Sequence, residues 1–276
     1  MPFLAAESYD PAREWQAVIR GVPYDGAVSW RAGAASAPAE VRRVSESLES
    51  YSPRLGRDLE DLALADAGDL DVSGLGGKRF VDAVARSTEQ HARHVPLVVT
   101  LGGDHSVSMG TSAGLRSVHA GLACVVVDAH LDMRPDYEGD LYSHACGTRT
   151  MASAGPVCAL GIRSGERQEF RDADELLAGW SSGLVLTDPM RRALGDRPVL
   201  LSVDMDVLDP SVLPGTGNPE PGGPRFDELR DALLGLPDLD VVGVDLVEAA
   251  PALDASEISA AAAAALTREL VLRFTS

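Results

Sequence analysis

An apolar run that stops abruptly at a cluster of polar residues constrains this chain more than any other feature. Residues Leu122 to Val127 are all apolar, and Asp128-Ala129-His130-Leu131-Asp132 follows at once. An unbroken apolar run of this length is typical of a strand buried on both faces of a parallel sheet. Residues two apart on an extended chain point the same way. We therefore expect Asp128, His130 and Asp132 to converge at the end of a buried strand.

The same pattern recurs at other places in the chain. Polar residues follow three further apolar runs: Asp104 and His105 after Pro96–Leu101, Asp204 and Asp206 after Pro198–Val203, and Asp245 and Glu248 after Asp240–Val244. In parallel α/β sheets, ligands bind at the carboxyl ends of the strands. The sequence thus predicts that two His and at least four Asp gather at one edge of a sheet.

The order of elements predicts an α/β fold with a mostly parallel central sheet and helices on both faces, three αβα layers in all. Strands are expected at residues 15–21, 62–66, 96–101, 122–127, 156–160, 183–186, 198–203 and 240–244, and nothing regular is expected before residue 15. Helices are expected near residues 37–42, 79–94, 107–118, 172–177, 190–194, 227–234 and 256–274. A (β/α)8 barrel fits the same alternation. No linker divides the chain, so we expect one domain over residues 1–276.

Composition limits the location of the protein. The chain has 276 residues, of which 45% are hydrophobic, and no apolar run approaches the length of a membrane span. The first residues lack a basic segment followed by an apolar one, so no secretory signal is expected. Cys124, Cys146 and Cys158 form no Cys-x-x-Cys pair. A cytoplasmic protein without disulfides is the expected outcome.

The formal net charge of -18 excludes some classes of partner. Such a chain repels nucleic acid and anionic membranes, and it attracts metal ions and cationic small molecules. Solubility alone, or life in a high-salt cytoplasm, accounts for the charge equally well.

The number and type of candidate ligands favour a particular metal chemistry. Two His and four Asp exceed the four ligands of a typical zinc site, and they suit a pair of divalent ions with mostly oxygen ligands, such as Mn²⁺. Two such ions a few Å apart activate a water molecule for hydrolysis. Each residue alone has an ordinary structural explanation, and only the set favours metal. His91, His94 and His119 lie on or beside predicted helices, away from strand ends, and are interpreted as surface residues.

Four motifs together resemble the ureohydrolase family of arginases and agmatinases. They are Gly102-Gly103-Asp104-His105-Ser106, Asp128 to Asp132, Ser202 to Pro210, and Asp245-Leu246-Val247-Glu248, and the resemblance extends from about Gly21 to Leu270. The resemblance implies a three-layer α/β fold, two Mn²⁺ per subunit, and assembly as homotrimers or homohexamers. Two other interpretations are less favoured: His105, Asp132 and Glu248 argue against a single-zinc deacetylase-like hydrolase, and the six filled metal-ligand positions argue against a non-catalytic relative.

The resemblance also implies a role for individual residues. His105 and Asp132 match ligands of one manganese ion, and His130 and Asp206 match ligands of the other. Asp128 and Asp204 match the carboxylates that bridge the two ions. Glu248 matches the acid that holds the guanidinium group of the substrate, and His144 matches a histidine that lines the site and transfers protons. The family usually has Gly after that histidine, where this chain has Ala145.

The implied reaction is hydrolysis of a guanidino compound to urea and an amine, with Asp132 or His144 supplying the proton to the leaving amine. Residues 21–25, 161–164 and 215–223 resemble agmatinases, so agmatine, which yields putrescine, is the expected substrate. Arg134 and Arg163 leave alternatives open. They can bind a carboxylate tail, as in guanidinobutyrate, or form structural salt bridges. Formiminoglutamate and arginine are further candidate substrates.

Overall fold

A single parallel sheet runs through the computed structural model, which describes residues 1–275. Within this range the sheet has nine strands, and every neighbouring pair is parallel. In spatial order they are β1 (Glu7–Ser8), β5 (Leu64–Asp69), β2 (Ala17–Gly21), β6 (Leu97–Leu101), β11 (Asp240–Val247), β10 (Pro198–Asp204), β7 (Ala123–Val127), β8 (Val157–Leu160) and β9 (Gly179–Ser181). This open sheet rules out the barrel alternative.

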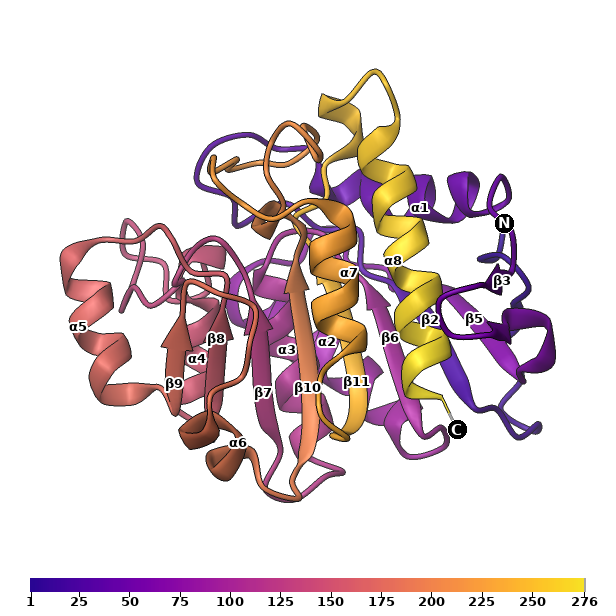
Figure 1. Cartoon of the computed structure of the whole chain (residues 1–276), viewed down its shortest axis with the longest axis horizontal. Helices are drawn as coiled ribbons and strands as arrows, with labels where there is room; N and C mark the ends of the chain where they lie inside the picture. Colours follow the sequence, from indigo (N-terminus) through magenta and orange to yellow (C-terminus); the bar gives the residue numbers. More distant parts are fainter. Residues whose placement is uncertain (276) are drawn as a thin grey trace.

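Helices cover both faces of the sheet, which gives the expected three layers (Figure 1). In this view α7 (Phe226–Leu234) and α8 (Ile258–Phe274) lie in front, while α2 (Gly77–Ala92) and α3 (Ser106–Arg116) lie behind. The helix α1 (Ala37–Ser45) packs against α8, and α4 (Gly147–Ala152) packs against α3. The helices α5 (Arg167–Leu176) and α6 (Asp188–Leu194) lie towards the β9 edge. A short hairpin, β3 (Tyr51–Ser52) with β4 (Arg57–Asp58), lies outside the sheet.

The central strands are apolar because both of their faces are covered. All residues of β6 and β7 are buried, and the side chains from Ala123 to Val127 have no measurable exposure. A fully buried Val side chain contributes about 1.5–3 kcal/mol relative to an exposed one. This burial fixes the register of the strands, and therefore the position of the polar residues that follow them.

Two strands differ from the sequence predictions. The edge strand β1 was not expected, because two residues that pair with β5 leave no periodic pattern. The predicted strand at residues 183–186 is wrong, because β9 pairs with β8 four residues earlier. The apolar residues that suggested a strand there do not pair with the sheet: Leu186 is buried in the main core, whereas Val185 is 67% exposed.

The loop at residues 22–33 crosses the carboxyl edge of the sheet and lies directly on Gly103. A Cβ atom at Gly103 would lie 1.6 Å from the carbonyl oxygen of Tyr24. Next to it, the amide of Asp104 donates a hydrogen bond to that oxygen at 2.8 Å. The glycine is thus required for contact between two loops, since a side chain there would displace the loop.

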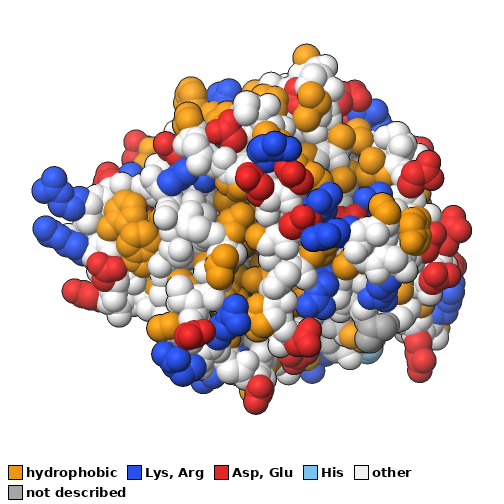
Figure 2. Space-filling view, in the orientation of Figure 1, with side chains coloured by type: hydrophobic (Ala, Val, Ile, Leu, Met, Phe, Trp, Pro, Cys, Tyr) orange, Lys and Arg blue, Asp and Glu red, His pale blue; other side chains and the backbone are white. Residues whose placement is uncertain are grey.

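No helix in residues 1–275 is both long enough and apolar enough to cross a membrane. Figure 2 shows acidic and basic groups mixed over the face in view, so the excess of acid does not form one large patch there.

Candidate active site

Six candidate metal ligands meet where the four central strands end. His105 follows β6 and is the N-cap residue of α3, while Asp128, His130 and Asp132 follow β7. Asp204 is the last residue of β10, and Asp206 lies in the single-turn helix η4 (Met205–Val207). Because β6, β11, β10 and β7 are neighbours in that order, their carboxyl ends share one edge.

His105 points into a group of three carboxylates. Its Nδ1 atom lies 3.0 Å from Oδ2 of Asp128, 3.2 Å from Oδ2 of Asp132 and 3.2 Å from Oδ2 of Asp204. On its other side, Nε2 lies 3.1 Å from the hydroxyl of Ser202. A hydrogen bond of this kind holds the ring of a metal-binding histidine and selects its tautomer.

His130 belongs to a second group of ligands. Its Nδ1 atom lies 3.0 Å from Oδ2 of Asp206 and 3.8 Å from Oδ1 of Asp128. Two sets have ligand atoms that all lie within 4.8 Å of one another: His105 with Asp128 and Asp132, and Asp128 with His130 and Asp206. Asp128 is in both sets, so its two oxygens face two different ligand groups.

The protein itself supplies little positive charge to this cluster. Within residues 1–275, Asp128, Asp132, Asp204 and Asp206 form ion pairs with histidines and with no Lys or Arg. Burial, and then repulsion from Asp206, raises the pKa of Asp128 to about 7. Burial and its carboxylate neighbours raise the pKa of Asp204 well above its usual value. Such a group of buried oxygen donors is suited to divalent cations.

Two buried atoms also lack hydrogen bonds. Nδ1 of His105 and Oδ2 of Asp128 make none within the described part of the chain. Buried polar atoms without partners are uncommon in proteins, and they mark places where an ion or water binds. The ligand set therefore fits metal ions.

Two residues at this edge have an unusual backbone conformation. Asp132 has φ 49° and Glu248 has φ 61°, in the left-handed region that residues other than Gly rarely occupy. Each such residue costs of the order of 1–3 kcal/mol, and such strain is often found at functional sites. At Glu248 the conformation is held by hydrogen bonds, since its amide donates to the carbonyl of Gly103 at 2.8 Å.

Glu248 and His144 form a buried pair beside the ligands. Nδ1 of His144 lies 3.0 Å from Oε1 of Glu248, which also accepts a hydrogen bond from the amide of His105 at 2.9 Å. Although burial opposes the charged form, Glu248 raises the pKa of His144 to about 9. No hydrogen bond to Oε2 of Glu248 is found within residues 1–275, so this oxygen is free to bind a ligand.

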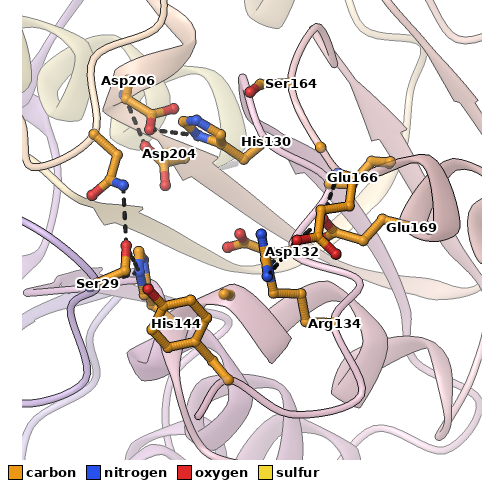
Figure 3. Close-up of a pocket in the computed structure, with 15 residues that line it drawn as sticks. Ser29, His130, Asp132, Arg134, His144, Ser164, Glu166, Glu169, Asp204 and Asp206 are labelled. Carbon is orange, nitrogen blue, oxygen red and sulfur yellow. Dashed lines mark hydrogen bonds and ion pairs between the residues drawn. The ribbon is translucent and has the colours of Figure 1, made fainter.

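A cavity of about 350 Å³ opens above these residues. Figure 3 shows His130, Asp204 and Asp206 along one side of it, and Arg134, Glu166 and Glu169 along another. The remaining polar residues of the wall are Ser29, Asp132, Tyr137, His144, Ser164 and Asn218. Glu248 does not line this cavity and lies behind His144, with 3% of its surface exposed.

The two arginines singled out from the sequence have different surroundings. Arg134 lines the cavity, and its guanidinium pairs with Oε1 of Glu166 at 3.0 Å and approaches Oε2 of Glu169 at 3.8 Å. Arg163 is absent from the cavity wall and donates hydrogen bonds to the carbonyls of Glu220, Gly161 and Asp206. Its contacts hold the loop of Asp206 in place and leave it no contact with the cavity.

Several cavity residues were not found from the sequence. These residues are Ser29, Glu166, Glu169 and Asn218, and none of them belongs to a motif of metal ligands at a strand end. Ser29 and Asn218 also lie on loops, where no periodic pattern marks them. The interpretation of His91 as a surface residue is wrong, since it is 8% exposed and packs edge-on against Tyr9. Its position on the buried side of α2, with Phe80, Val84 and Thr88, indicates this placement.

The fold and the site together define an α/β protein with an acidic, candidate metal-binding centre at the carboxyl edge of its sheet. The model of the arginase family matches residues 15–272. The agmatinase of Bacillus cereus is 37% identical over 274 residues, which cover 96% of this chain and 94% of that protein. The N(1)-aminopropylagmatine ureohydrolase of Thermococcus kodakarensis is 36% identical over 243 residues, 84% of this chain and 82% of that protein.

A solved structure agrees with these relatives. Proclavaminate amidino hydrolase from Streptomyces clavuligerus superposes with a TM-score of 0.87 and 27% identity, covering 100% of this chain and 97% of that one. The chain belongs to the arginase family and is a ureohydrolase.

Proposed function

We propose that this ureohydrolase converts agmatine to putrescine and urea at a centre of two Mn²⁺ ions. The observation that carries the proposal is the pair of ligand groups that share Asp128, close to a buried carboxylate with one free oxygen, Oε2 of Glu248. The residues that would hold the ions are His105, Asp128, His130, Asp132, Asp204 and Asp206, and Asp128 belongs to both ligand groups. The 37% identity to the agmatinase of Bacillus cereus over nearly the whole chain supports the substrate.

The chain's own residues would orient the substrate, and the metal ions would activate the nucleophile. Divalent ions in such a site lower the pKa of a water molecule and provide hydroxide near neutral pH. Carbon in a guanidinium group is a poor electrophile, so its position matters. The carboxylate of Glu248 would bind the planar cation through charge-assisted hydrogen bonds and hold this carbon over the ligand cluster.

Loss of the amine requires a proton on the leaving nitrogen. Two groups of the chain can deliver it. The imidazole of His144 lines the cavity with Nδ1 3.0 Å from Oε1 of Glu248, and the carboxylate of Asp132 lies at the boundary between the cavity and His105. Either group would first take up the proton that the attacking water releases.

The cavity mouth is suited to the second charge of agmatine. Arg134 contributes one positive charge, while Glu166 and Glu169 contribute two negative charges. The balance favours an ammonium tail over a carboxylate tail. Arg134 is thus interpreted as the partner of these acids, and a substrate role of Arg163 has no support in its contacts.

The remaining features of the proposal concern the setting of the enzyme. Cys124, Cys146 and Cys158 are free and buried, which fits the reducing cytoplasm. We propose that residues 1–276 act as one ureohydrolase domain, assembled as a homotrimer or homohexamer, with a role in polyamine biosynthesis.

A panel of substrates tests the proposal. The purified chain is stripped of metal, loaded with Mn²⁺, Co²⁺ or Fe²⁺, and assayed for release of urea from agmatine, aminopropylagmatine, arginine, guanidinobutyrate and guanidinopropionate. Formiminoglutamate is assayed for release of its own product. Agmatine with Mn²⁺ should give the highest kcat/KM. Absence of urea from every guanidine, in protein that retains bound metal, would refute the proposal.

A further inference from the structure

Ser29 makes two contacts with the same nitrogen of His144. Its hydroxyl lies 2.9 Å from Nε2, and its backbone N–H donates a hydrogen bond to Nε2 at 3.1 Å. Ser29 belongs to the loop at residues 22–33, which is more than 100 residues from His144 in sequence. We propose that Ser29 is a positioning residue, which holds His144 neutral with its proton on Nδ1 and so leaves Glu248 free to bind a guanidinium cation. This inference rests on the proposed function of Glu248.

The backbone contact determines which nitrogen carries the proton. A backbone N–H can only donate, so Nε2 must offer a lone pair to accept it. A neutral imidazole then has its hydrogen on Nδ1, which faces Oε1 of Glu248 at 3.0 Å. An imidazolium would instead direct a second N–H against the amide of Ser29.

The hydroxyl of Ser29 also acts as a donor towards His144, because its oxygen already accepts a hydrogen bond from Asn218. Nδ2 of Asn218 lies 3.1 Å from Oγ of Ser29 and donates to it, which leaves the hydroxyl hydrogen for Nε2 of His144. The chain of hydrogen bonds therefore runs in one direction, from Asn218 through Ser29 and His144 to Glu248. Such chains strengthen their members and fix each side chain in one orientation.

The loop that carries Ser29 is itself held in place. Oδ2 of Asp104 accepts a hydrogen bond from the amide of Ala27 at 2.9 Å, and the carbonyl of Ala27 accepts one from the amide of His144 at 3.3 Å. Arg31 donates to the carbonyls of Thr216 and Gly217. Ser29 is therefore fixed from both sides and can impose its geometry on His144.

Two influences on His144 oppose each other. The carboxylates that face it, Glu248 first and then Asp132 and Asp104, favour the imidazolium and raise its pKa. The N–H and hydroxyl of Ser29 favour the neutral ring. If the imidazolium formed, it would compensate the charge of Glu248 and compete with a cationic substrate. The contacts of Ser29 thus protect the affinity of the site for guanidinium.

The decisive measurement is the tautomer of His144. Imidazole ¹⁵N NMR on the full chain, recorded without metal and with diamagnetic Zn²⁺, assigned through His144→Gln, reports the protonation of both ring nitrogens. In the wild type near pH 10, above the raised pKa of His144, we expect a neutral ring with hydrogen on Nδ1. In Ser29→Ala we expect the His144 titration to move up by about one pH unit. An Nε2–H tautomer or an imidazolium in the wild type at that pH would overturn the inference.

Kinetics provide the second measurement. In Ser29→Ala, the acidic limb of kcat/KM for agmatine should move up by about one pH unit, and KM at pH 7.5 should rise about tenfold with a smaller change in kcat. Ser29→Thr keeps the hydroxyl and should behave like the wild type. Ser36→Ala is the matched control, because the one hydrogen bond of the Ser36 hydroxyl within residues 1–275 is to the carbonyl of Gly33. An unchanged pH profile in Ser29→Ala would refute the inference. If the wild type releases no urea, the proposed function fails, and the NMR experiment still tests the tautomer.

Discussion

Nδ1 of His105 lies 3.0 Å from Oδ2 of Asp128, and neither atom makes a hydrogen bond within residues 1–275. Both side chains are fully buried. A buried carboxylate surrounded by other carboxylates is unfavourable until a cation joins it. Stability and metal binding should therefore change in opposite directions when Asp128 is neutralised.

In Asp128→Asn, the protein without metal should be at least as stable as the wild type, with a gain of roughly 1 kcal/mol. Free Mn²⁺ at a concentration 100 times its Kd should stabilise the wild type by about 2.7 kcal/mol for each bound ion, or about 5–10 °C in Tm. The variant should lose most of that increase. Thermal unfolding with and without Mn²⁺ measures both effects. A variant that keeps the full metal-dependent rise would show that Asp128 is not a shared ligand.

Glu248→Gln separates substrate binding from metal binding. The change removes the buried negative charge behind His144 but no member of either ligand group. We expect kcat/KM for agmatine to fall roughly 100-fold, since a hydrogen bond to a charged group contributes about 1.5–3 kcal/mol. Metal content, measured by elemental analysis, should equal that of the wild type. In contrast, Asp206→Asn should lose bound metal, and equal metal loss in both variants would contradict the assigned roles.

The substrate tail can be tested at the cavity mouth, where Arg134 pairs with Glu166. Arg134→Met leaves the carboxylates of Glu166 and Glu169 without their cation. We expect the ratio of kcat/KM for agmatine over guanidinobutyrate to rise roughly three- to tenfold, with a larger rise at low salt. Glu166→Gln is the matched opposite change, and it should lower the ratio. If Arg134→Met lowers this ratio of kcat/KM values or leaves it unchanged, the charges at the cavity mouth do not select the charge of the substrate tail.

The sheet and the ligand cluster could be predicted from the sequence because one physical rule connects them. Buried parallel strands read as unbroken apolar runs, and their carboxyl ends share an edge, so the residues after β6, β7 and β10 had to meet. The strand that carries Glu248 was expected to end at residue 244, yet β11 continues to Val247. Asp245 and Leu246 pair with β10 inside the sheet, which places Glu248 at the same edge.

The residues of the cavity wall could not be predicted in this way. Ser29 and Asn218 reach the site through hydrogen bonds between loops separated by more than 100 residues, and no periodic pattern encodes such contacts. The strand β9 was placed wrongly for a related reason. Its residues, Gly179 to Ser181, are only partly buried, so the apolar signal came from Leu184 and Leu186, which pack without pairing.

His91 offers a test of pH-dependent stability away from the cavity. It lies on α2 and is buried beside Tyr9. Burial, followed by the charges of Arg20 and His94, lowers the pKa of His91 to about 4 from the ordinary 6.5. A base whose pKa is lower in the folded state takes up its proton more readily after unfolding. Stability from this group is therefore complete above pH 6.5 and is lost as the pH falls from 6.5 to about 4, on the order of 2 kcal/mol in total.

His91→Leu should remove that part of the acid sensitivity while filling a similar volume. Urea unfolding of both proteins at pH 7.5, 6 and 5 gives the free energy of unfolding, and the loss between pH 7.5 and 5 should be smaller in the variant by about 1 kcal/mol or more. His94→Leu, three residues further along and exposed, is the control. It removes only the smallest of the three influences on the pKa of His91, so it should lose nearly as much stability as the wild type. Parallel pH profiles for all three proteins would mean that His91 is as free to be protonated in the fold as in the unfolded chain.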